Sequence, residues 1–335
     1  MKAKYWKKID ENSLMCELCP RYCVIKNNGT GYCKARAEKN GKLVSLVYGR
    51  PAAIAVDPIE KKPLYHFLPG SKTLSIGTIG CNMGCLFCQN HHLSRADVNS
   101  NYYAEISPDE IVTKARVLGC PSIALTYNDP TVFYEYAMDI AIRAKEEGIK
   151  VILVTAAFIN EKPRRELYSI VDAINVDLKA FSNHFYKKFA RADLQIILDS
   201  LEYICSQGQI WLEITNLLIP GENDSTDEIK KMTSWISRHL SNKIPIHFSA
   251  FHPAWKMTNK SSTPKQTLET ARKIAIDNGL ENVYTGNVHD SEGSNTYCPR
   301  CRAVVIKREG FSISDLHIDI RGNCMDCKQE IDGIF

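Results

Sequence analysis

The sequence predicts an α/β protein, built as a partial, TIM-like barrel of six strand–helix units, (βα)6, with a cysteine-rich segment at each end. Short apolar runs alternate with amphipathic stretches between residues 71 and 290. Six units are too few to close an eight-unit barrel. Eleven of the 13 cysteines fall into three groups, before, inside and after this region. We therefore expect an N-terminal cysteine-rich extension over residues 1–70, a barrel over 71–290 and a metal-binding C-terminal module over 291–335.

The alternating region supplies six strands, most of them continuous apolar runs, as expected for strands that are buried on both faces. These strands cover residues 74–79, 122–126, 150–155, 173–178, 210–218 and 244–251. A helix is expected after each strand, over residues 108–119, 132–147, 161–170, 193–206, 226–240 and 264–278. The clearest helix start is Ser107-Pro108-Asp109-Glu110, with a hydroxyl cap, a proline in the first turn and a carboxylate three residues after the cap.

The composition is that of an ordinary globular enzyme, with 44% hydrophobic and 24% charged residues among 335. A formal net charge of +4 is too small to argue for a polyanionic partner such as nucleic acid. The grouped cysteines indicate metal sites in a reducing compartment rather than a disulfide scaffold. The N-terminus has no apolar core behind its lysines, and no apolar run approaches about 20 residues. We therefore expect a cytoplasmic protein without a signal peptide or a membrane span.

Cys81, Cys85 and Cys88 form a C-x3-C-x2-C run directly after the first apolar strand. Three thiolates can hold three irons of a cubane iron–sulfur cluster and leave the fourth iron open to a cofactor, whereas four thiolates would close it. A zinc knuckle is the alternative, because zinc needs a fourth ligand that His91 or His92 could supply. The loop over residues 80–107 places the triplet at the carboxyl-terminal rim of the strands, where α/β proteins bind their ligands.

Two C-x2-C pairs near the C-terminus are typical of a zinc ribbon. They consist of Cys298, Cys301, Cys324 and Cys327, with strand-like residues 304–306 and 318–320 between the pairs. A module of under about 40 residues cannot bury enough core to fold unaided. Metal binding worth on the order of 10 kcal/mol would hold it together. An iron cluster or four unliganded thiols are the alternatives.

A third group, near the N-terminus, contains Cys16, Cys19, Cys23 and Cys33. Four thiolates suit either a structural zinc ion or a second, auxiliary iron–sulfur cluster that relays electrons or holds substrate. We take structural zinc as the working expectation for this group.

The spacing of Cys81, Cys85 and Cys88 resembles that of the radical S-adenosylmethionine (SAM) enzymes. The resemblance implies that the three cysteines hold a [4Fe–4S] cluster whose open iron chelates the amino and carboxylate groups of SAM. One electron from the cluster then splits the sulfonium and releases a 5′-deoxyadenosyl radical. The resemblance also implies a partial barrel of six units.

Polar residues after the second and third strands match positions that bind SAM in these enzymes. Asn128 and Asp129, followed by a proline, replace a Gly-Gly-Glu-Pro segment whose acidic residue and backbone bind the methionine amino group. The same residues are also a good signal for a turn and a helix start. Thr155 matches a position near the ribose.

Three residues after the later strands resemble elements of the pyruvate formate-lyase-activating enzymes. Asp177 and Lys179 match an Asp-x-Lys element that lies beside SAM, and an exposed ion pair is the alternative interpretation. His252 matches a histidine that approaches SAM, and a role in capping the barrel is an equal alternative. His66 also lies near the rim, without an assigned role.

Six segments together resemble one family, the AmmeMemoRadiSam system radical SAM enzymes, which are relatives of the pyruvate formate-lyase activases. These segments begin at Cys16, Lys62, Thr78, Tyr127, Asn175 and Cys298. The family name implies association with an AMMECR-type and a Memo-type protein. An electron donor such as ferredoxin or flavodoxin is implied by the chemistry.

The expected function is therefore reductive cleavage of SAM, followed by hydrogen abstraction from a substrate that the sequence does not identify. A partner protein is one such substrate, as in glycyl-radical activation. Radical modification of a nucleotide or a small metabolite is the alternative. A non-catalytic, zinc-binding interaction protein is the alternative from a different functional class.

Overall fold

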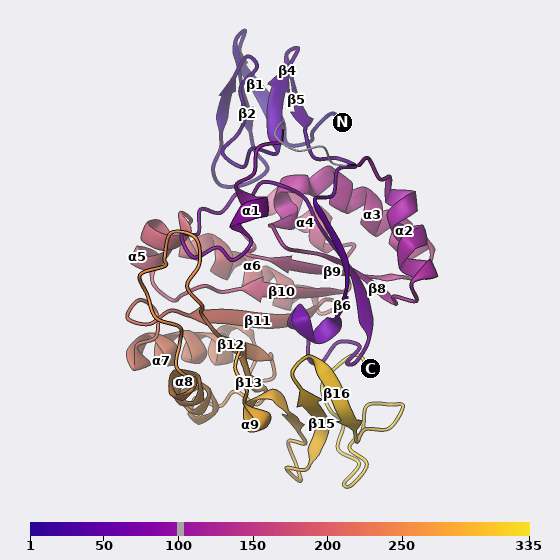
Figure 1. The fold of residues 1–335 in the computed structure, drawn as a ribbon, viewed down its shortest axis with the longest axis vertical. Helices are drawn as coiled ribbons and strands as arrows, with labels where there is room; N and C mark the ends of the chain where they lie inside the picture. Colours follow the sequence, from indigo (N-terminus) through magenta and orange to yellow (C-terminus); the bar gives the residue numbers. More distant parts are fainter. Residues whose placement is uncertain (99–103) are drawn as a thin grey trace.

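The computed structural model describes residues 1–98 and 104–335, and in these residues it contains one large eight-stranded sheet (Figure 1). The strand order is β13-β12-β11-β10-β9-β8-β7-β6. β6 pairs antiparallel with β7, and all other neighbouring strands are parallel. β6 and β13 form the two edges, so the sheet is open. The strands are β6 (Ala53–Pro58), β7 (Lys72–Gly77), β8 (Ser122–Leu125), β9 (Lys150–Thr155), β10 (Ala173–Asp177), β11 (Trp211–Leu218), β12 (Ile246–Ala250) and β13 (Val283–Gly286).

Strands β7 to β12 are the six strands that the sequence predicts, and their apolar residues are buried. The sheet is larger than predicted, because β13 adds a seventh parallel strand and β6 adds an antiparallel edge. The sequence pattern misses β13 because Val-Tyr-Thr-Gly is too short to form an apolar run. It misses β6 because that strand lies among the loop-rich first 70 residues, although it pairs with β7 along its whole length.

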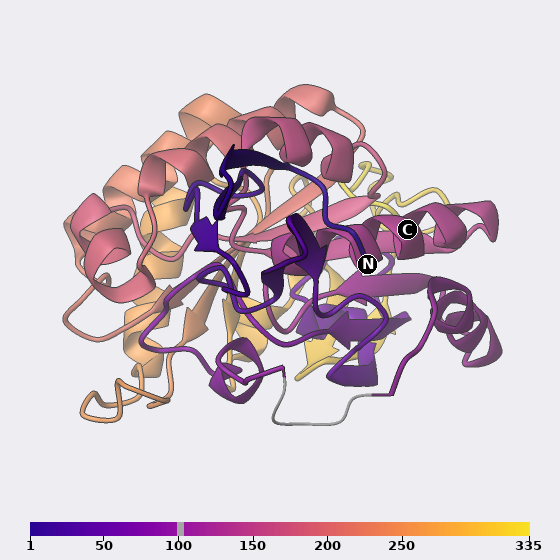
Figure 2. The same ribbon diagram turned by 90° about the horizontal axis from the view of Figure 1, so that it is seen from above.

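A helix follows each of the six predicted strands, and these helices form an arc around the outside of the curved sheet (Figure 2). The capping box at Ser107 is present, since its side chain accepts a hydrogen bond from the Glu110 backbone and Glu110 accepts one in return. The six helices are α2 (Pro108–Val117), α3 (Tyr134–Glu146), α4 (Glu161–Tyr168), α6 (Leu194–Gln207), α7 (Thr226–Trp235) and α8 (Lys265–Asp277). Shorter turns are η1 (Ile59–Lys61), α1 (His91–Ser94), η2 (Pro130–Phe133), α5 (Asn183–Phe185), η3 (Tyr186–Ala190), η4 (Ile236–Leu240) and α9 (Ser291–Ser294).

Small antiparallel sheets lie at opposite ends of the molecule in Figure 1. The N-terminal sheets are formed by β1 (Trp6–Asp10), β2 (Ser13–Cys16) and β3 (Val24–Lys26), and by β4 (Arg36–Lys39) with β5 (Lys42–Ser45). The C-terminal sheet contains β14 (Thr296–Tyr297), β15 (Val304–Glu309) and β16 (Ser312–Leu316). In the part of the chain that the structure describes, no helix has the length and apolar character needed to cross a membrane.

Glu213 on β11 is a fully buried carboxylate that holds the segment after η1 against the sheet. It accepts hydrogen bonds from the backbone N–H groups of Tyr65 (2.9 Å) and His66 (2.8 Å). Trp211 Nε1 (3.0 Å) and His247 Nε2 (2.6 Å) also donate to it. Burial alone would raise the pKa of Glu213, but the hydrogen bond from His247 lowers that pKa below its ordinary value. The carboxylate is therefore charged and fully paired.

Arg308 on β15 attaches the C-terminal sheet to the same segment. Its side chain is buried, and its Nη2 donates to the backbone oxygen of Tyr65 at 2.6 Å, while Nη1 donates to Thr296 Oγ1 at 2.9 Å. The guanidinium lies 4.0 Å from the centre of the Tyr65 ring, and its Nε lies 4.0 Å from a carboxylate oxygen of Glu60. Segments far apart in sequence thus share one buried polar network beneath the sheet.

Replacing Glu213 by Gln keeps the shape of the side chain but places an amide group among four hydrogen-bond donors. We expect the free energy of unfolding to fall by about 3 kcal/mol, because the amide group cannot accept all the hydrogen bonds that the carboxylate accepts and a buried donor loses its partner. Thermal unfolding should show a clearly lower melting temperature. The control, Glu202→Gln on the exposed face of α6, should cost less than about 0.5 kcal/mol. Equal melting temperatures for the two variants would contradict this role of Glu213.

Candidate active site

A cavity of about 500 Å³ opens where the parallel strands end. Its walls include the residues at or just beyond the carboxyl ends of β8, β9, β10 and β13, namely Thr126, Thr155, Asp177 and Gly286. Eight of the predicted site residues line this cavity: Cys81, Cys85, Cys88, Asn128, Asp129, Thr155, Asp177 and Lys179. This agrees with the rule that α/β sheets keep their ligands at the carboxyl ends of the strands.

The triplet lies on the loop that follows β7, in a region of close backbone packing. Gly80 has φ +85°, and a Cβ at that position would lie 2.3 Å from the backbone oxygen of Cys33. Only glycine permits this approach of the N-terminal extension to the loop. Cys81 and Cys85 are buried and Cys88 is half-buried. The Met83 N–H donates to Cys81 Sγ at 3.4 Å.

The environment of the triplet fits a bound metal cluster. Burial raises the pKa of the Cys85 thiol to about 11 and raises that of Cys81 further. Binding of a cationic group offsets this effect of burial, because it stabilises the thiolate form that metal ligands require. Among the described residues, sets of three or more ligand atoms within 4.8 Å of one another occur in the C-terminal group alone. The zinc alternative, with His91 or His92 as fourth ligand, is therefore not supported by the geometry.

Asn128 holds the loop that leads into the triplet. Its Oδ1 accepts a hydrogen bond from the Thr78 backbone at 3.0 Å, and its Nδ2 donates to the Gly80 backbone oxygen at 2.7 Å. The side chain is buried, and it also donates to Thr78 Oγ1 at 3.1 Å. Because these contacts occupy both the oxygen and the amide hydrogens, Asn128 positions Cys81 rather than offering free groups to a ligand.

Asp129 links the second and third strands. Its Oδ1 accepts from the Thr131 backbone at 3.0 Å, which caps η2. Its Oδ2 accepts from Thr155 Oγ1 at 3.0 Å and from the Ala156 backbone at 2.9 Å. A carboxylate has about four acceptor positions, so one remains for a cationic group in the cavity. Both interpretations of Asp129, as a cap and as a ligand-binding acid, fit this arrangement.

Lys179 and Asp177 form an ion pair inside the cavity, with Nζ and Oδ2 3.0 Å apart. Burial lowers the pKa of Lys179, but the charge of the Asp177 carboxylate outweighs it, so that the net pKa is raised. Lys179 therefore carries a positive charge beside the triplet. The pair is not the simple exposed surface pair, because the Lys179 side chain is only 14% exposed.

His252 and His66 lie elsewhere. His252 is exposed, it hydrogen-bonds with Ser262 Oγ at 3.2 Å, and it does not line the cavity. His66 is buried under the sheet, where its ring nitrogens contact the Asp332 backbone oxygen (2.6 Å) and the Tyr284 hydroxyl (2.5 Å). It belongs to the Glu213 network rather than to the rim.

The cavity residues that the sequence reasoning missed include Tyr65, His247 and Phe311. Phe311 lies in the turn between β15 and β16, so the C-terminal sheet forms part of the cavity wall. The signal that could have found His247 is Glu213, a carboxylate in the middle of an apolar strand, which requires a buried partner.

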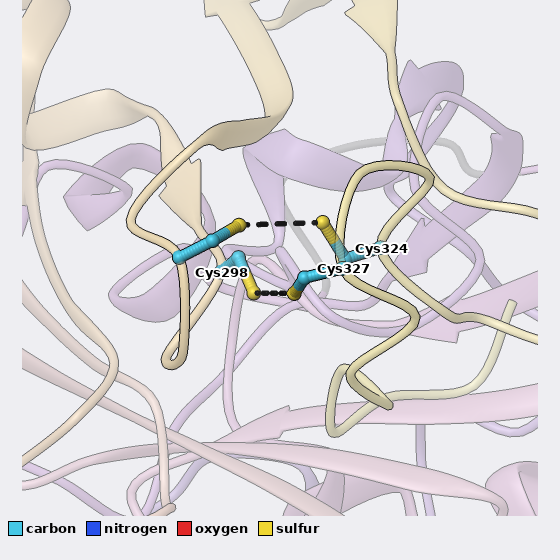
Figure 3. Close-up of side chains that lie close together, drawn as sticks. Cys298, Cys324 and Cys327 are labelled. Carbon is cyan, nitrogen blue, oxygen red and sulfur yellow. Dashed lines mark hydrogen bonds between the residues drawn. The ribbon is translucent and has the colours of Figure 1, made fainter.

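The four C-terminal cysteines converge as predicted (Figure 3). Cys298 Sγ lies 3.5 Å from Cys327 Sγ, and Cys301 Sγ lies 3.7 Å from Cys324 Sγ. A tetrahedral zinc site with zinc–sulfur bonds of about 2.3 Å places its sulfurs about 3.8 Å apart. The spacing fits one tetrahedral ion, for which zinc is the expected metal.

The N-terminal cysteines line a second, smaller cavity of their own. All four, Cys16, Cys19, Cys23 and Cys33, contribute to its wall. Asn82, which follows Cys81 in the chain, lies in the same wall. The two cavities are therefore separated by the loop that carries the triplet.

A model of the radical SAM superfamily matches residues 75–233, which include the triplet. The uncharacterized protein MJ0808 of Methanocaldococcus jannaschii is 40% identical over 331 residues, covering 98% of each chain. This chain belongs to the radical SAM superfamily. Family membership accounts for the open sheet and the loop triplet together, which a non-catalytic zinc-binding protein does not.

Other proteins are similar to this chain at lower sequence identity. The putative glycyl-radical enzyme activating enzyme MJ1632 of Methanocaldococcus jannaschii is 25% identical over 214 residues, which cover 62% of this chain and 78% of the relative. A radical SAM methyltransferase from Sphaerobacter thermophilus has a similar fold, with a TM-score of 0.51 at 14% identity, covering 86% of this chain and 77% of that one. SuiB of Streptococcus suis, bound to the precursor peptide SuiA, also has a similar fold, with a TM-score of 0.51 at 14% identity. The match covers 69% of this chain and 52% of that one.

Cys327→Ser should remove the C-terminal metal ion. We expect the zinc content of the purified protein, measured by elemental analysis, to fall by about one ion per chain, because three thiolates bind the ion far less tightly. The C-terminal sheet should then become accessible to proteases. Cys205→Ser on α6, outside the three cysteine groups, is the matched control and should leave the zinc content unchanged. Unaltered zinc in the Cys327 variant would refute the assignment.

Proposed function

We propose that this radical SAM enzyme holds its [4Fe–4S] cluster on Cys81, Cys85 and Cys88 and binds SAM in the adjoining cavity. The cluster, when bound and reduced, supplies the electron that cleaves SAM to methionine and a 5′-deoxyadenosyl radical. The observation that supports the proposal best is that the triplet shares one cavity with Asp129, Thr155 and Lys179. The superfamily match explains why these groups occur together.

Some residues of the cavity are suited to binding SAM, and others position these residues or the cysteine loop. Asp129 has one acceptor position left for the ammonium group of SAM. Thr155 donates a hydrogen bond to the Asp129 carboxylate and fixes the orientation of that carboxylate. Lys179 is a charged donor suited to the SAM carboxylate, and Asp177 suits a ribose hydroxyl. Asn128 keeps the loop before Cys81 in place. His252 is withdrawn from the proposed SAM site, because its side chain is exposed outside the cavity.

The proposed reaction is abstraction of a hydrogen atom from a carbon of a partner protein. The relative MJ1632 is described as a putative activating enzyme of a glycyl-radical enzyme, and this description supports a protein substrate for the present chain. A ferredoxin or flavodoxin would supply the electron in the cytoplasm. The AMMECR-type and Memo-type proteins stay candidate partners by resemblance alone.

The proposed division of the chain follows the sequence, with one change. Residues 1–70 form the cysteine-rich extension, residues 71–290 the barrel and residues 291–335 the zinc-ribbon-like module. Because β6 pairs with β7 over six residues, we assign β6 to the barrel.

Cys85→Ala should abolish SAM cleavage. After anaerobic reconstitution and reduction with dithionite, 5′-deoxyadenosine formation should fall by at least about 100-fold, since two thiolates no longer hold the cluster that supplies the electron. Chromatography of the nucleoside product measures the effect. Cys205→Ala is the control and should retain wild-type turnover. Wild-type amounts of 5′-deoxyadenosine from the Cys85 variant would end the proposal.

The variants Lys179→Met and His252→Ala test whether SAM binds inside the cavity or at the exposed rim. Loss of the lysine charge should weaken SAM binding about 10- to 100-fold, because a hydrogen bond to a charged group contributes about 1.5–3 kcal/mol. Loss of the exposed histidine should change the dissociation constant less than about twofold. Equilibrium dialysis of reconstituted protein with equal iron content gives both values. The reverse order of effects would place SAM nearer to β12 than proposed.

A further inference from the structure

The N-terminal cysteines enclose a cavity that the proposed function does not use. Cys16, Cys19, Cys23 and Cys33 come from β2, the turns after it and the chain just before β4, and all four line one cavity. Cys16 and Cys19 are buried, and the other two are half-buried. Four cysteines around one internal space form a complete set of thiolate ligands.

Arg36 supplies an independent sign of a ligand in this cavity. Its side chain is 1% exposed and lies in the cavity wall. One nitrogen, Nη2, donates to the Lys4 backbone oxygen and to Glu135 Oε1, each at 2.7 Å. Within the described part of the chain, its Nε and Nη1 have no hydrogen-bond partner. Buried N–H groups without partners are costly, and sulfur atoms of a bound, anionic thiolate complex would accept from them.

The spacing of the sulfur atoms distinguishes a cluster from a single ion. In the C-terminal group the paired sulfurs lie 3.5 and 3.7 Å apart, as around one tetrahedral ion. Of the described residues, only that group brings three or more ligand atoms within 4.8 Å of one another. In the N-terminal set, as in the Cys81 triplet, no three sulfur atoms lie that close to one another. A four-iron cubane separates its thiolates in this way, because iron and sulfide atoms lie between them.

The N-terminal cavity directly adjoins the catalytic loop. Asn82, the residue after Cys81, lies in its wall, and its Oδ1 is buried without a partner among the described residues. On the other side of Cys81, the Cys33 backbone oxygen approaches Gly80 so closely that a Cβ there would clash with it. The N-terminal cysteines therefore pack against residues 80–82, the stretch of chain that contains Cys81.

We propose that Cys16, Cys19, Cys23 and Cys33 hold a second four-iron cluster, fully ligated by the protein, with Arg36 donating hydrogen bonds to its sulfur atoms. This assignment replaces the structural zinc expected from the sequence. It concerns a site separate from the triplet, so it can fail while the proposed function stands, and the reverse also holds.

The test uses the full chain with the catalytic triplet removed, Cys81→Ala/Cys85→Ala/Cys88→Ala, reconstituted without oxygen with iron and sulfide. We expect about four irons and four sulfides per chain, one zinc, a brown colour and a paramagnetic signal after reduction with dithionite. The wild-type protein should contain about eight irons. An iron-free, colourless triplet variant, with either two zinc ions or one, would overturn the proposal.

A second variant keeps the test decisive if the first does not fold. Cys16→Ala/Cys19→Ala leaves the triplet intact and should lower the iron content from about eight to about four per chain. Unchanged iron in this variant overturns the second cluster. Failure of the proposed function has a different signature, since the triplet variant would then contain as much iron as the wild type. Cys120→Ala/Cys205→Ala, outside all three groups, controls for the loss of two thiols.

Discussion

The parallel register of β7 to β13 is the constraint on which the candidate site depends. Parallel strands end at the same edge of the sheet, so the residues that follow them meet although they are distant in sequence. Asp129 after β8 and Thr155 at the end of β9 come close enough to share a hydrogen bond of 3.0 Å. Asp177 at the end of β10 pairs with Lys179 in the same cavity. The loop after β7 then needs only to carry three cysteines to the edge.

Two buried charges hold together the part of the molecule next to this cavity. Glu213 and Arg308 are both fully enclosed, and each is expensive to bury without partners. Glu213 is satisfied by backbone and ring donors from β11, β12 and the segment after η1. Nη1 and Nη2 of Arg308 donate to hydroxyl and backbone oxygens from β14 and the same segment, while its Nε has, among the described residues, only the Glu60 carboxylate at 4.0 Å. Because the partners come from distant parts of the sequence, the network fixes how these parts pack.

Much of the fold and of the site was predictable because it rests on local patterns. Six strands appear as apolar runs, and Ser107 marks its helix through a capping box that the structure contains. The C-x2-C pairs converge because two short turns present their thiols to one point. What was not predictable depends on tertiary contacts. β6 is recognisable only through its pairing with β7, and β13 is too short to form a pattern.

For the site residues too, local sequence patterns predict some features, whereas others depend on tertiary contacts. Asn128 was predicted to contact SAM, yet its contacts to Thr78 and Gly80 make it a support of the loop, which spacing cannot reveal. His252 follows β12 by two residues, and its side chain is exposed beside Ser262 rather than in the cavity wall. His247, on the strand itself, lies in the cavity wall instead. Sequence distance from a strand end is thus a weaker guide than the direction of each side chain.

The turn that carries Phe311 links one wall of the cavity to the C-terminal cysteines. Phe311 belongs to a small sheet whose own apolar core is slight, so a metal ion on its four thiols would do much to order it. Loss of such an ion would leave the cavity open on the Phe311 side, even in a chain whose loop triplet is intact.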